Sequence, residues 1–244
     1  MDNAMYVGLS RQMVLRRELN IAANNIANVD TAGFKLESLM NRAEPQARAR
    51  NRGVDGPTVF VMGDAVARDF KQGGLRQTGG TFDLAIDGQG FFKVLSDAGE
   101  RYTRDGRFKL DPLGKLVTQD GAAVQGDGGE VIIDPAKGPV AIAENGVVSQ
   151  DGQRVAQISV YRFDSLAALE KDGDNLFRNV TNLTPQTATD AKLRQGVLEG
   201  SNVEPVVQIT RLIELTRAYE TISQLMNQTA DLSRRSIQRL GAVG

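Results

Sequence analysis

The chain has 244 residues and a mass of 26.4 kDa, and its 29 basic residues nearly balance its 30 acidic residues. This length allows one large domain or two smaller ones with hydrophobic cores. The balanced charge disfavours nucleic acid as a partner, because nucleic-acid binders usually carry a basic surface. The absence of Cys and His excludes disulfides, zinc sites built on these residues, and catalysis by thiolate or imidazole. We therefore expect a protein that is not an enzyme and that has no cofactor and no metal site.

The N-terminal residues lack the pattern of a cleavable secretory signal. Arg11, Arg16 and Arg17 lie where such a signal would need an uninterrupted apolar core. The sequence also has no run of about 18 consecutive apolar residues, the length that a membrane-spanning helix requires. We therefore expect neither a cleavable signal peptide nor direct membrane insertion.

Glycine is unevenly distributed along the chain. Of the 26 glycines, 22 lie between residues 51 and 200, which leaves two in the first 50 residues and two in the last 44. Because an interior glycine costs a helix about 1 kcal/mol relative to alanine, the ends can form long helices while the middle favours turns and strands. The sequence therefore predicts an α+β protein, in which a glycine-rich, mainly antiparallel β domain is flanked by N- and C-terminal amphipathic helices.

Residues 1–30 are predicted to form the N-terminal helix. Asp2 or Asn3 can accept hydrogen bonds from the free N–H groups of the first turn, and the helix should end near Asn28. Apolar residues at spacings of three, four or their sums form one stripe along this helix. The stripe consists of Met5, Leu9, Leu15, Leu19, Ala22, Ala23 and Ile26.

Residues 201–244 are predicted to form the C-terminal helix. Pro205 suits a first helical turn because its φ is fixed and it lacks an N–H group, and Gly241 suits the end. At about 1.5 Å per residue, a helix of this length would reach roughly 50 Å, so part of it must project or contact another helix. Its apolar stripe consists of Leu212, Leu215, Tyr219, Ile222 and Met226.

Apolar stripes at both ends of one chain favour terminal helices that pair with each other or with other copies. The simpler interpretation is that both helices only cover the central domain. Because an isolated helix in water gains too little free energy to offset the entropy lost on ordering, we expect both ends to remain largely unstructured before they find their partners.

Between the two helices, residues 31–75 are expected to form an extended connector with one or two strands, and residues 76–200 an all-β domain. Short apolar segments in the second region alternate with turn dipeptides at intervals of about ten residues, which is typical of antiparallel sheets. We expect the glycine of each dipeptide to supply the positive φ of a tight hairpin turn. The dipeptides are Asp87-Gly88, Asp105-Gly106, Asp120-Gly121, Asn145-Gly146 and Asp151-Gly152.

A group of aspartates in the β region is the main candidate for chemistry. Two carboxylates could cleave a glycoside, so one hypothesis is a carbohydrate-binding or carbohydrate-acting β domain with dimerising terminal helices. Aspartates at turns, however, commonly hydrogen-bond the local backbone, and this structural interpretation is favoured here. The group consists of Asp83, Asp87, Asp105, Asp111 and Asp120.

Three asparagines lie near the end of the N-terminal helix, although asparagine is a poor helix former. Asn28 could cap the helix, but Asn24 lies four residues earlier on the same face, and Asn25 is adjacent to Asn24. Buried polar residues at a helix interface can specify register and partner. We therefore include all three asparagines in the predicted interface.

The segment around these asparagines, NNIANVDTAGFK at residues 24–35, resembles the N-terminal signature of bacterial flagellar rod, hook and hook-associated axial proteins. The resemblance continues through TFDLAIDGQGFFKV at 81–94, RYTRDGRFKLDPLGKLVTQDGAAVQG at 101–126 and EGSNVEPVVQITRLIELTRAYE at 199–220. In length and in its single β domain, the chain is most similar to the proximal-rod members, and the distal-rod members are the nearest alternative.

The resemblance implies a structural subunit of the flagellar basal-body rod. It implies that the terminal helices pair as a coiled-coil-like inner layer around a central export channel, that the β domain forms the outer layer, and that helical assembly transmits motor torque. The implied partners are other copies of the chain, other rod proteins including the distal-rod protein, and the flagellar type III export apparatus. The implied location is the periplasm-spanning rod, reached without a cleavable signal.

The two helical stripes and the asparagines together define the predicted subunit interface. Its residues are Met5, Leu9, Leu15, Leu19, Asn24, Asn25, Ile26, Asn28, Leu212, Leu215, Tyr219, Ile222 and Met226.

Overall fold

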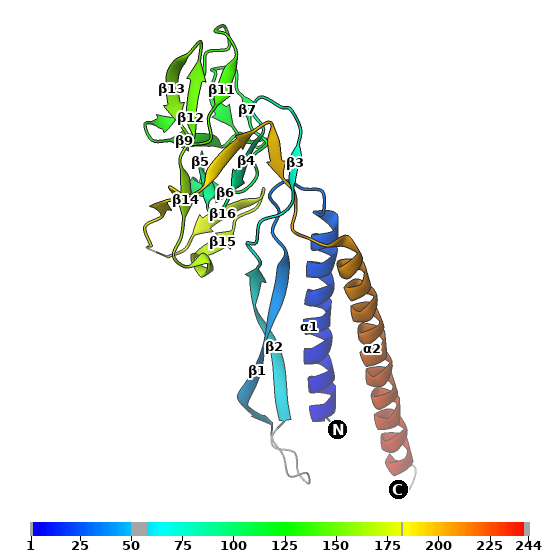
Figure 1. The fold of residues 1–244 in the computed structure, drawn as a ribbon. Coiled ribbons are helices and arrows are strands. Elements are labelled where there is room, and N and C mark those ends of the chain that lie inside the picture. Colours follow the sequence, from blue (N-terminus) through cyan, green and yellow to red (C-terminus); the bar gives the residue numbers. More distant parts are fainter. Residues whose placement is uncertain (1, 50–57, 182, 242–244) are drawn as a thin grey trace. The chain divides into compact units, whose positions relative to one another are not determined.

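A computed structural model of the chain describes residues 2–49, 58–181 and 183–241, which fold into two compact units (Figure 1). Unit 1 comprises Met1–Ala27, Leu36–Asp69 and Glu204–Gly244, and unit 2 comprises Asn28–Lys35 and Phe70–Val203. Unit 1 contains both long helices, and unit 2 is built of short strands. The predicted α+β class, with a helix at each end and a mainly antiparallel β body, is confirmed.

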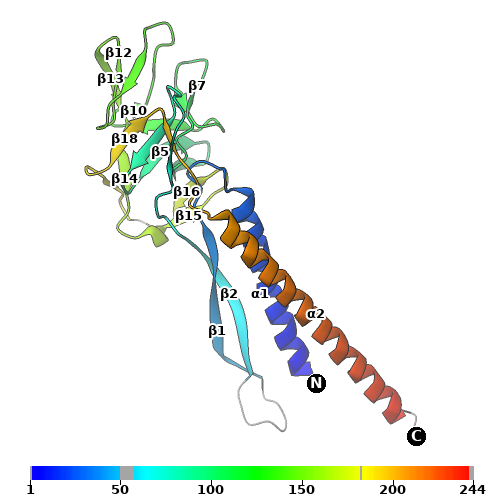
Figure 2. The same ribbon diagram turned by 45° about the vertical axis from the view of Figure 1, so that its right-hand side comes forward.

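Unit 1 contains helices α1 (Asp2–Ala27) and α2 (Pro205–Gly241) and strands β1 (Glu37–Ala49) and β2 (Thr58–Arg68). The helix bounds agree with the starts and ends expected from the sequence. Figures 1 and 2 show α1 between α2 on one side and the β1–β2 pair on the other. The two helices contact each other within unit 1. That both ends are unstructured before assembly stays a prediction.

Strands β1 and β2 lie in the segment expected to be an extended connector. They pair with each other antiparallel, from Glu37 opposite Arg68 to Ala49 opposite Thr58. The register is irregular between Glu44 and Ala49, the interval that contains Pro45. Proline is tolerated there because each strand of a two-stranded ribbon has a free edge and need not donate at every position. The connector thus contains a long two-stranded ribbon that belongs to unit 1.

Unit 2 contains the remaining strands and one 3-10 turn, η1 (Leu166–Ala168). In chain order the strands are β3 (Leu75–Gln77), β4 (Leu84–Asp87), β5 (Phe91–Ser96), β6 (Gly99–Thr103), β7 (Lys109–Leu110), β8 (Leu116–Val117), β9 (Ala123–Gly126), β10 (Gly129–Glu130), β11 (Val140–Ile142), β12 (Val147–Gln150), β13 (Gln153–Gln157), β14 (Val160–Arg162), β15 (Leu169–Lys171), β16 (Leu176–Asn179), β17 (Gln186–Thr187), β18 (Lys192–Gln195) and β19 (Val197–Glu199).

The largest sheet of unit 2 has ten strands, with a main path β15-β16-β6-β5-β9-β8-β7. Strand β10 pairs with β9, and β14 pairs with both β5 and β17. Smaller sheets are β11-β12-β13, β4 with β18, and β3 with β19, and every strand pair among the described residues is antiparallel. The last two pairs place the first and last strands of unit 2 side by side.

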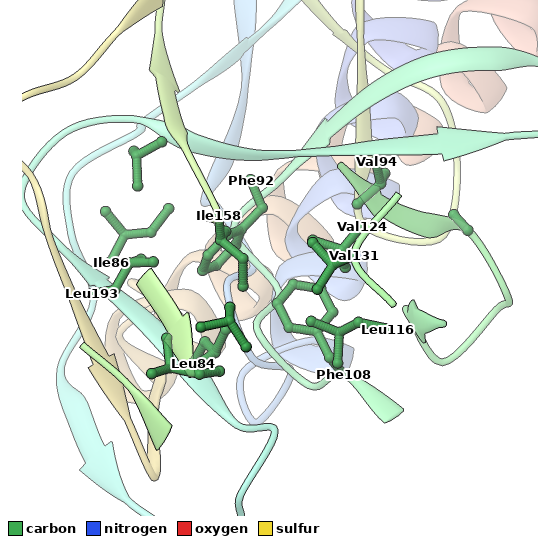
Figure 3. Packing of buried hydrophobic residues seen from close by; sticks show 14 of the residues in the cluster. Leu84, Ile86, Phe92, Val94, Phe108, Leu116, Val124, Val131, Ile158 and Leu193 are labelled. Atoms are coloured by element: carbon green, nitrogen blue, oxygen red, sulfur yellow. The ribbon is translucent and has the colours of Figure 1, made fainter. Parts of the chain in front are cut away.

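The main core of unit 2 lies among these strands (Figure 3). The rings of Phe92 and Phe108 meet edge to face with their centroids 5.1 Å apart. Full burial of one such side chain contributes about 1.5–3 kcal/mol, so this cluster is a major source of the unit's stability. Its labelled members in Figure 3 are Leu84, Ile86, Phe92, Val94, Phe108, Leu116, Val124, Val131, Ile158 and Leu193.

A second, smaller core contains aromatic side chains. Successive strand residues point to opposite faces, so Phe92 of β5 joins the main core while Phe91 joins this cluster. Phe91 packs there with Tyr102, Phe163 and Phe177. Burial, with a smaller effect of Glu100 and then Tyr161, raises the pKa of the Tyr102 hydroxyl to about 12. The ten-stranded sheet therefore buries apolar side chains on both faces of β5.

Most of the expected glycine turns have the expected backbone conformation. Gly88, Gly121, Gly146 and Gly152 all have positive φ. Gly106 is not among the residues with positive φ, so the prediction for the Asp105-Gly106 dipeptide is wrong. Glycine is needed at position 106 for another reason: a Cβ atom there would lie 1.6 Å from the carbonyl oxygen of Leu84.

Replacing Gly106 by alanine should therefore destabilise unit 2. The Cβ atom cannot be accommodated without displacing the backbone of β4, and overpacking of this kind typically costs about 1–3 kcal/mol or more. Gly128→Ala is the matched control, because a Cβ at Gly128 meets no atom within 4 Å. Scanning calorimetry should show a lower unfolding temperature for G106A only. Equal unfolding temperatures in both variants would contradict the close approach.

Candidate assembly interface

Helices α1 and α2 pack through an apolar seam. Leu15 and Ala22 of α1 and Leu215 of α2 are buried at its centre. Both helices thus place part of the stripe predicted from the sequence against each other. The partly buried residues around this centre are Leu19, Leu212, Ala218, Tyr219 and Ile222.

Contacts beside the seam define the direction of the two helices. The amide Nε2 of Gln12 donates to the Ser223 hydroxyl at 2.9 Å. Nearer the N-terminus of α1, a Cβ atom on Gly8 would lie 3.1 Å from Cγ of Met226. As residue numbers fall along α1 they rise along α2, so the helices are antiparallel. The small residue at position 8 lets Met226 approach α1 closely.

An ion pair lies toward the other end of the seam. The guanidinium of Arg211 on α2 contacts the carboxylate of Glu18 on α1 at 3.1 Å. The Glu18 side chain is almost fully buried, whereas that of Arg211 is more than half exposed. Neither residue was part of the predicted interface, because single charged residues in an amphipathic helix usually indicate its solvated face.

Asn25 connects all three parts of unit 1. Its Nδ2 donates to the Glu37 carbonyl at 2.8 Å, and its Oδ1 accepts from the Glu37 N–H at 3.0 Å. The side-chain amide therefore satisfies both backbone groups of the first residue of β1, as a neighbouring strand would. The same Nδ2 lies 3.4 Å from Oε1 of Gln208 on α2. Only 1% of Asn25 is exposed, so the structure places this predicted interface residue inside unit 1.

The other two asparagines occupy different surroundings. Asn24 is exposed, and Asn28 belongs to the turn that follows α1, where its side chain accepts from the Thr31 hydroxyl at 3.2 Å. The sequence had emphasised Asn24 and Asn28 as residues of one face, whereas the structure buries Asn25. Position alone could not identify the buried asparagine, because its hydrogen-bond partner lies in a strand that the sequence did not predict in detail.

The remaining predicted residues divide between packed and exposed positions. Ile26 and Met226 are half-buried, whereas Met5 and Leu9 in the first two turns of α1 are exposed. The structure thus brings the central and C-terminal part of the α1 stripe into contact with α2. Met5 and Leu9, at the N-terminal end of that stripe, remain 38% and 45% exposed.

Exposed apolar residues also occur on α2, outside the predicted stripe. Val206, Ile209 and Ile213 are 76%, 46% and 48% exposed. Their spacing of three and four residues places them on one helical face, so the signal was present in the sequence. It was overlooked because the longer row from Leu212 to Met226 is the more regular one.

The end of the signature segment belongs to unit 2, and its last residue, Lys35, takes part in a buried charge network. Lys35 Nζ contacts Glu199 Oε1 at 2.5 Å, and Arg104 NH1 contacts Glu199 Oε2 at 2.9 Å. The exposed fractions of the three side chains are 0% for Lys35, 0% for Glu199 and 3% for Arg104. Burial lowers the pKa of Arg104, and the charge and hydrogen bond of Glu199 oppose this effect.

Backbone groups complete this network. Lys35 Nζ donates to the Lys71 carbonyl at 2.7 Å, and Arg104 NH2 donates to the Gly88 carbonyl at 2.7 Å. The N–H of Gly33 donates to the Glu199 carbonyl at 2.8 Å. Glu199 therefore joins the segment after α1 to the last strand before α2, and the signature contributes to both units.

Four of the five candidate carboxylates of unit 2, those of Asp83, Asp87, Asp105 and Asp111, have structural partners. Asp111 Oδ1 accepts from the N–H groups of Leu113 and Lys115 at 2.9 and 2.7 Å, as expected for a turn aspartate. Asp105 forms an ion pair with Arg107 at 2.6 Å. Asp83 accepts from the Thr78 hydroxyl, and Asp87 pairs with Arg194. These contacts favour the structural interpretation of the aspartates over glycoside chemistry.

Comparison with known proteins finds flagellar families in three segments of the chain. The family "Flagella basal body rod protein" matches residues 5–35, "Flagellar hook protein FlgE/F/G D1 domain" matches 85–150, and "Flagellar basal body rod FlgEFG protein C-terminal" matches 194–239. The first and third matches cover most of α1 and α2, and the second lies in the β unit. Fold and matches together define an axial protein of the bacterial flagellum.

Individual relatives narrow this class. The chain is 56% identical to the flagellar basal-body rod protein FlgF of Caulobacter vibrioides over 244 residues, with 100% of both chains covered. It is 35% identical to FlgF of Mesorhizobium japonicum, with 99% of both covered, and 30% identical to FlgG of Bacillus subtilis, with 95% and 97% covered. The chain belongs to the flagellar basal-body rod protein family. The predicted resemblance is confirmed, and so is the prediction that the chain is a structural protein and not an enzyme.

Family membership assigns the chain to the flagellar basal-body rod. Within the part of the chain that the structure describes, neither helix has a stretch long and apolar enough to cross a membrane.

Replacing Asn25 by alanine should destabilise unit 1. The change leaves the N–H and carbonyl of Glu37 without their partner, and an unsatisfied buried polar group costs about 1–3 kcal/mol. Asn20→Ala on the exposed face of the same helix is the matched control and should change stability little. Urea unfolding followed by circular dichroism at 222 nm reports on unit 1, which holds both α-helices of the described residues. Equal midpoints for the two variants would contradict the role of Asn25.

Replacing Glu199 by glutamine should destabilise unit 2. The change removes the buried carboxylate charge that Lys35 and Arg104 both contact, and breaking a buried ion pair from one side costs about 3–5 kcal/mol. Glu130→Gln is the control, because the Lys115–Glu130 pair is about one-third exposed and surface pairs contribute about 1 kcal/mol or less. Near-ultraviolet circular dichroism during urea unfolding measures the difference. If Glu199→Gln lowers the stability of unit 2 no more than Glu130→Gln does, the network contributes little to stability.

Proposed function

We propose that the chain is an axial building block of the flagellar basal-body rod that assembles helically, transmits motor torque and lines the export channel. The observation that carries this proposal is full-length identity of 56% to a basal-body rod protein, on a fold whose two ends form one helical unit. A subunit repeated by a rotation that does not close forms an open helical tube, which suits an axle. The catalytic alternative lacks support, since four of the five candidate carboxylates have structural partners.

The proposed arrangement assigns different roles to the two units. Unit 1 contributes to an inner, coiled-coil-like layer, and unit 2 contributes to an outer layer that contacts neighbouring subunits. The antiparallel seam around Leu15 and Leu215 supports this assignment, because it gives each copy a rigid rod-like element. From the sequence, the inner layer was expected to consist of the helices at residues 1–30 and 201–244. In this proposal the inner layer is formed by unit 1, which contains these helices and also the β1–β2 ribbon.

The proposed partners are other copies of the chain, other rod proteins including the distal-rod protein, and the type III export apparatus that delivers axial proteins. Export by that apparatus would require no cleavable signal peptide, and the charged residues Arg11, Arg16 and Arg17 in the first helix are consistent with this route. The proposed location is the periplasm-spanning, proximal part of the rod.

Leu215→Asp should test the inner-layer role. A buried carboxylate in the α1–α2 seam would separate the helices, so the variant should be made in cells but be absent from purified basal bodies, and the cells should not swim. Leu225→Asp is the matched control because Leu225 is 56% exposed on the same helix and lies outside the seam. The measurement is immunoblotting of basal bodies from a flagellated host in which the variant replaces the native copy. Normal swimming with Leu215→Asp would refute the proposal.

A further inference from the structure

The first turns of α2 carry an apolar ridge that the described residues cover only in part. The ridge consists of Val206, Ile209 and Ile213, each about half exposed or more. All three are β-branched and therefore have few side-chain conformations to lose on binding. Exposed apolar residues grouped on one face commonly mark a contact surface. This ridge is therefore a candidate contact with another molecule.

Unit 1 also contains a groove of about 310 Å³ between α1, the start of β1 and α2. Its apolar walls include Ile21, Leu36, Leu39 and Leu215. A cavity of about 150 Å³ can hold a benzene-sized group, so this groove has room for more than one aliphatic side chain.

The groove suits uncharged side chains. Its two acidic residues are both paired within unit 1, Glu18 with Arg211 at 3.1 Å and Glu37 with Arg68 at 3.2 Å. The carboxylates are thus already neutralised, and the groove offers no unpaired charge of its own to a strongly charged ligand. Branched aliphatic side chains like those of the ridge match both its volume and its walls.

Ridge and groove lie on opposite sides of α2. Ile213 of the ridge and Leu215 of the groove are two residues apart, which corresponds to about 200° of rotation around a helix. The ridge of one chain therefore cannot enter the groove of the same chain. Two complementary surfaces on opposite sides of one element produce a head-to-tail contact, which repeats into a ring or an open helix.

We propose that the α2 ridge of one copy inserts into the groove between α1, β1 and α2 of the next copy. This inference rests on the proposed rod function and specifies the copy-to-copy contact within it. The proposed intersubunit contact uses Val206, Ile209 and Ile213 and not the stripe predicted from the sequence. The central residues of that stripe pack within the chain. One ridge is much smaller than a standard protein interface of about 800 Å² per partner, so the contact depends on additional contacts in the assembly.

The absence of cysteine from the sequence permits a direct cross-linking test. Ser38 is exposed and lines the groove, so Ser38→Cys together with Ile209→Cys places one thiol at the groove and one on the ridge. The full-length variant is expressed in place of the native copy, basal bodies are purified, and mild oxidation is followed by non-reducing electrophoresis. A disulfide requires Cα atoms about 4.4–6.8 Å apart, so only close neighbours will be joined.

The expected result is a series of covalent dimers and larger species that are lost on reduction. Each single variant should remain monomeric. The matched control is Ile209→Cys with Gln224→Cys, because Gln224 is exposed and lies 18 residues, or about five turns, beyond Val206 on the same face of α2. This control should not form the series.

The outcomes separate the inference from the proposed function. If the chain is present in basal bodies but the Ser38/Ile209 pair gives no dimers, the ridge-in-groove contact is wrong while the rod function stands. Dimers from Ile209→Cys alone would show that ridges face each other, and dimers from the Ile209/Gln224 pair would show that one α2 lies along another. Either result would overturn the inference. Cross-links to a different rod protein, identified by mass spectrometry, would overturn the assignment of a second copy as the partner. Absence of the chain from basal bodies would refute the proposed function itself.

Discussion

The apolar seam between α1 and α2 is the interaction on which the rest of unit 1 depends. It joins Leu15 and Ala22 to Leu215, residues about 200 positions apart, and so brings both ends of the chain into one unit. Neither helix would be stable alone in water, because most helical stability in proteins comes from packing of the apolar face. Once the seam has formed, Asn25 can hold the start of β1, and the groove acquires its walls.

Unit 2 relies on a different kind of interaction. Its cores are apolar, but the segment that follows α1 is held by the buried carboxylate of Glu199, which contacts Lys35 and Arg104. Burying charges is costly, and replacing such a network by apolar residues is often neutral or stabilising. The network provides directional hydrogen bonds. These bonds fix the position of the end of β19, the last strand, relative to the signature segment. An apolar cluster would hold the same segments with less specific geometry.

Much of the fold could be predicted because it depends on local patterns. Pro205, Gly241 and the spacing of apolar residues defined both helices, and the Asp-Gly and Asn-Gly pairs located several turns of the β unit. The strands after residue 165 were not foreseen, since they are short and several are exposed, so they lack an alternating apolar pattern. Gly106 was assigned the wrong role, because its requirement comes from the Leu84 carbonyl, a partner distant in sequence.

The candidate interface was less predictable, because its contacts join residues that are distant in the sequence. The stripe residues Leu15, Leu19, Leu215 and Ile222 pack within unit 1, and periodicity does not say whether the partner of such a stripe is the chain itself or another copy. Asn25 was found only as one of three asparagines, and its strand partner Glu37 could not be inferred. The charged partners in unit 1 and the Lys35, Glu199 and Arg104 network were missed, since each joins segments far apart in the sequence.

The antiparallel pairing of the two ends also constrains the order of events when the chain is made. Ribosomes add residues from the N-terminus, so α1 emerges first and α2 last, with the whole of unit 2 between them. The apolar face of α1 therefore remains without its partner helix until the 177 residues between Ala27 and Pro205, and then α2 itself, have been synthesised. Unit 2 can be completed before α2 is made, whereas unit 1 can be completed only once α2 is present. Until α2 has been made, nascent chains expose the apolar residues of the α1 segment, and exposed apolar segments of this kind favour aggregation.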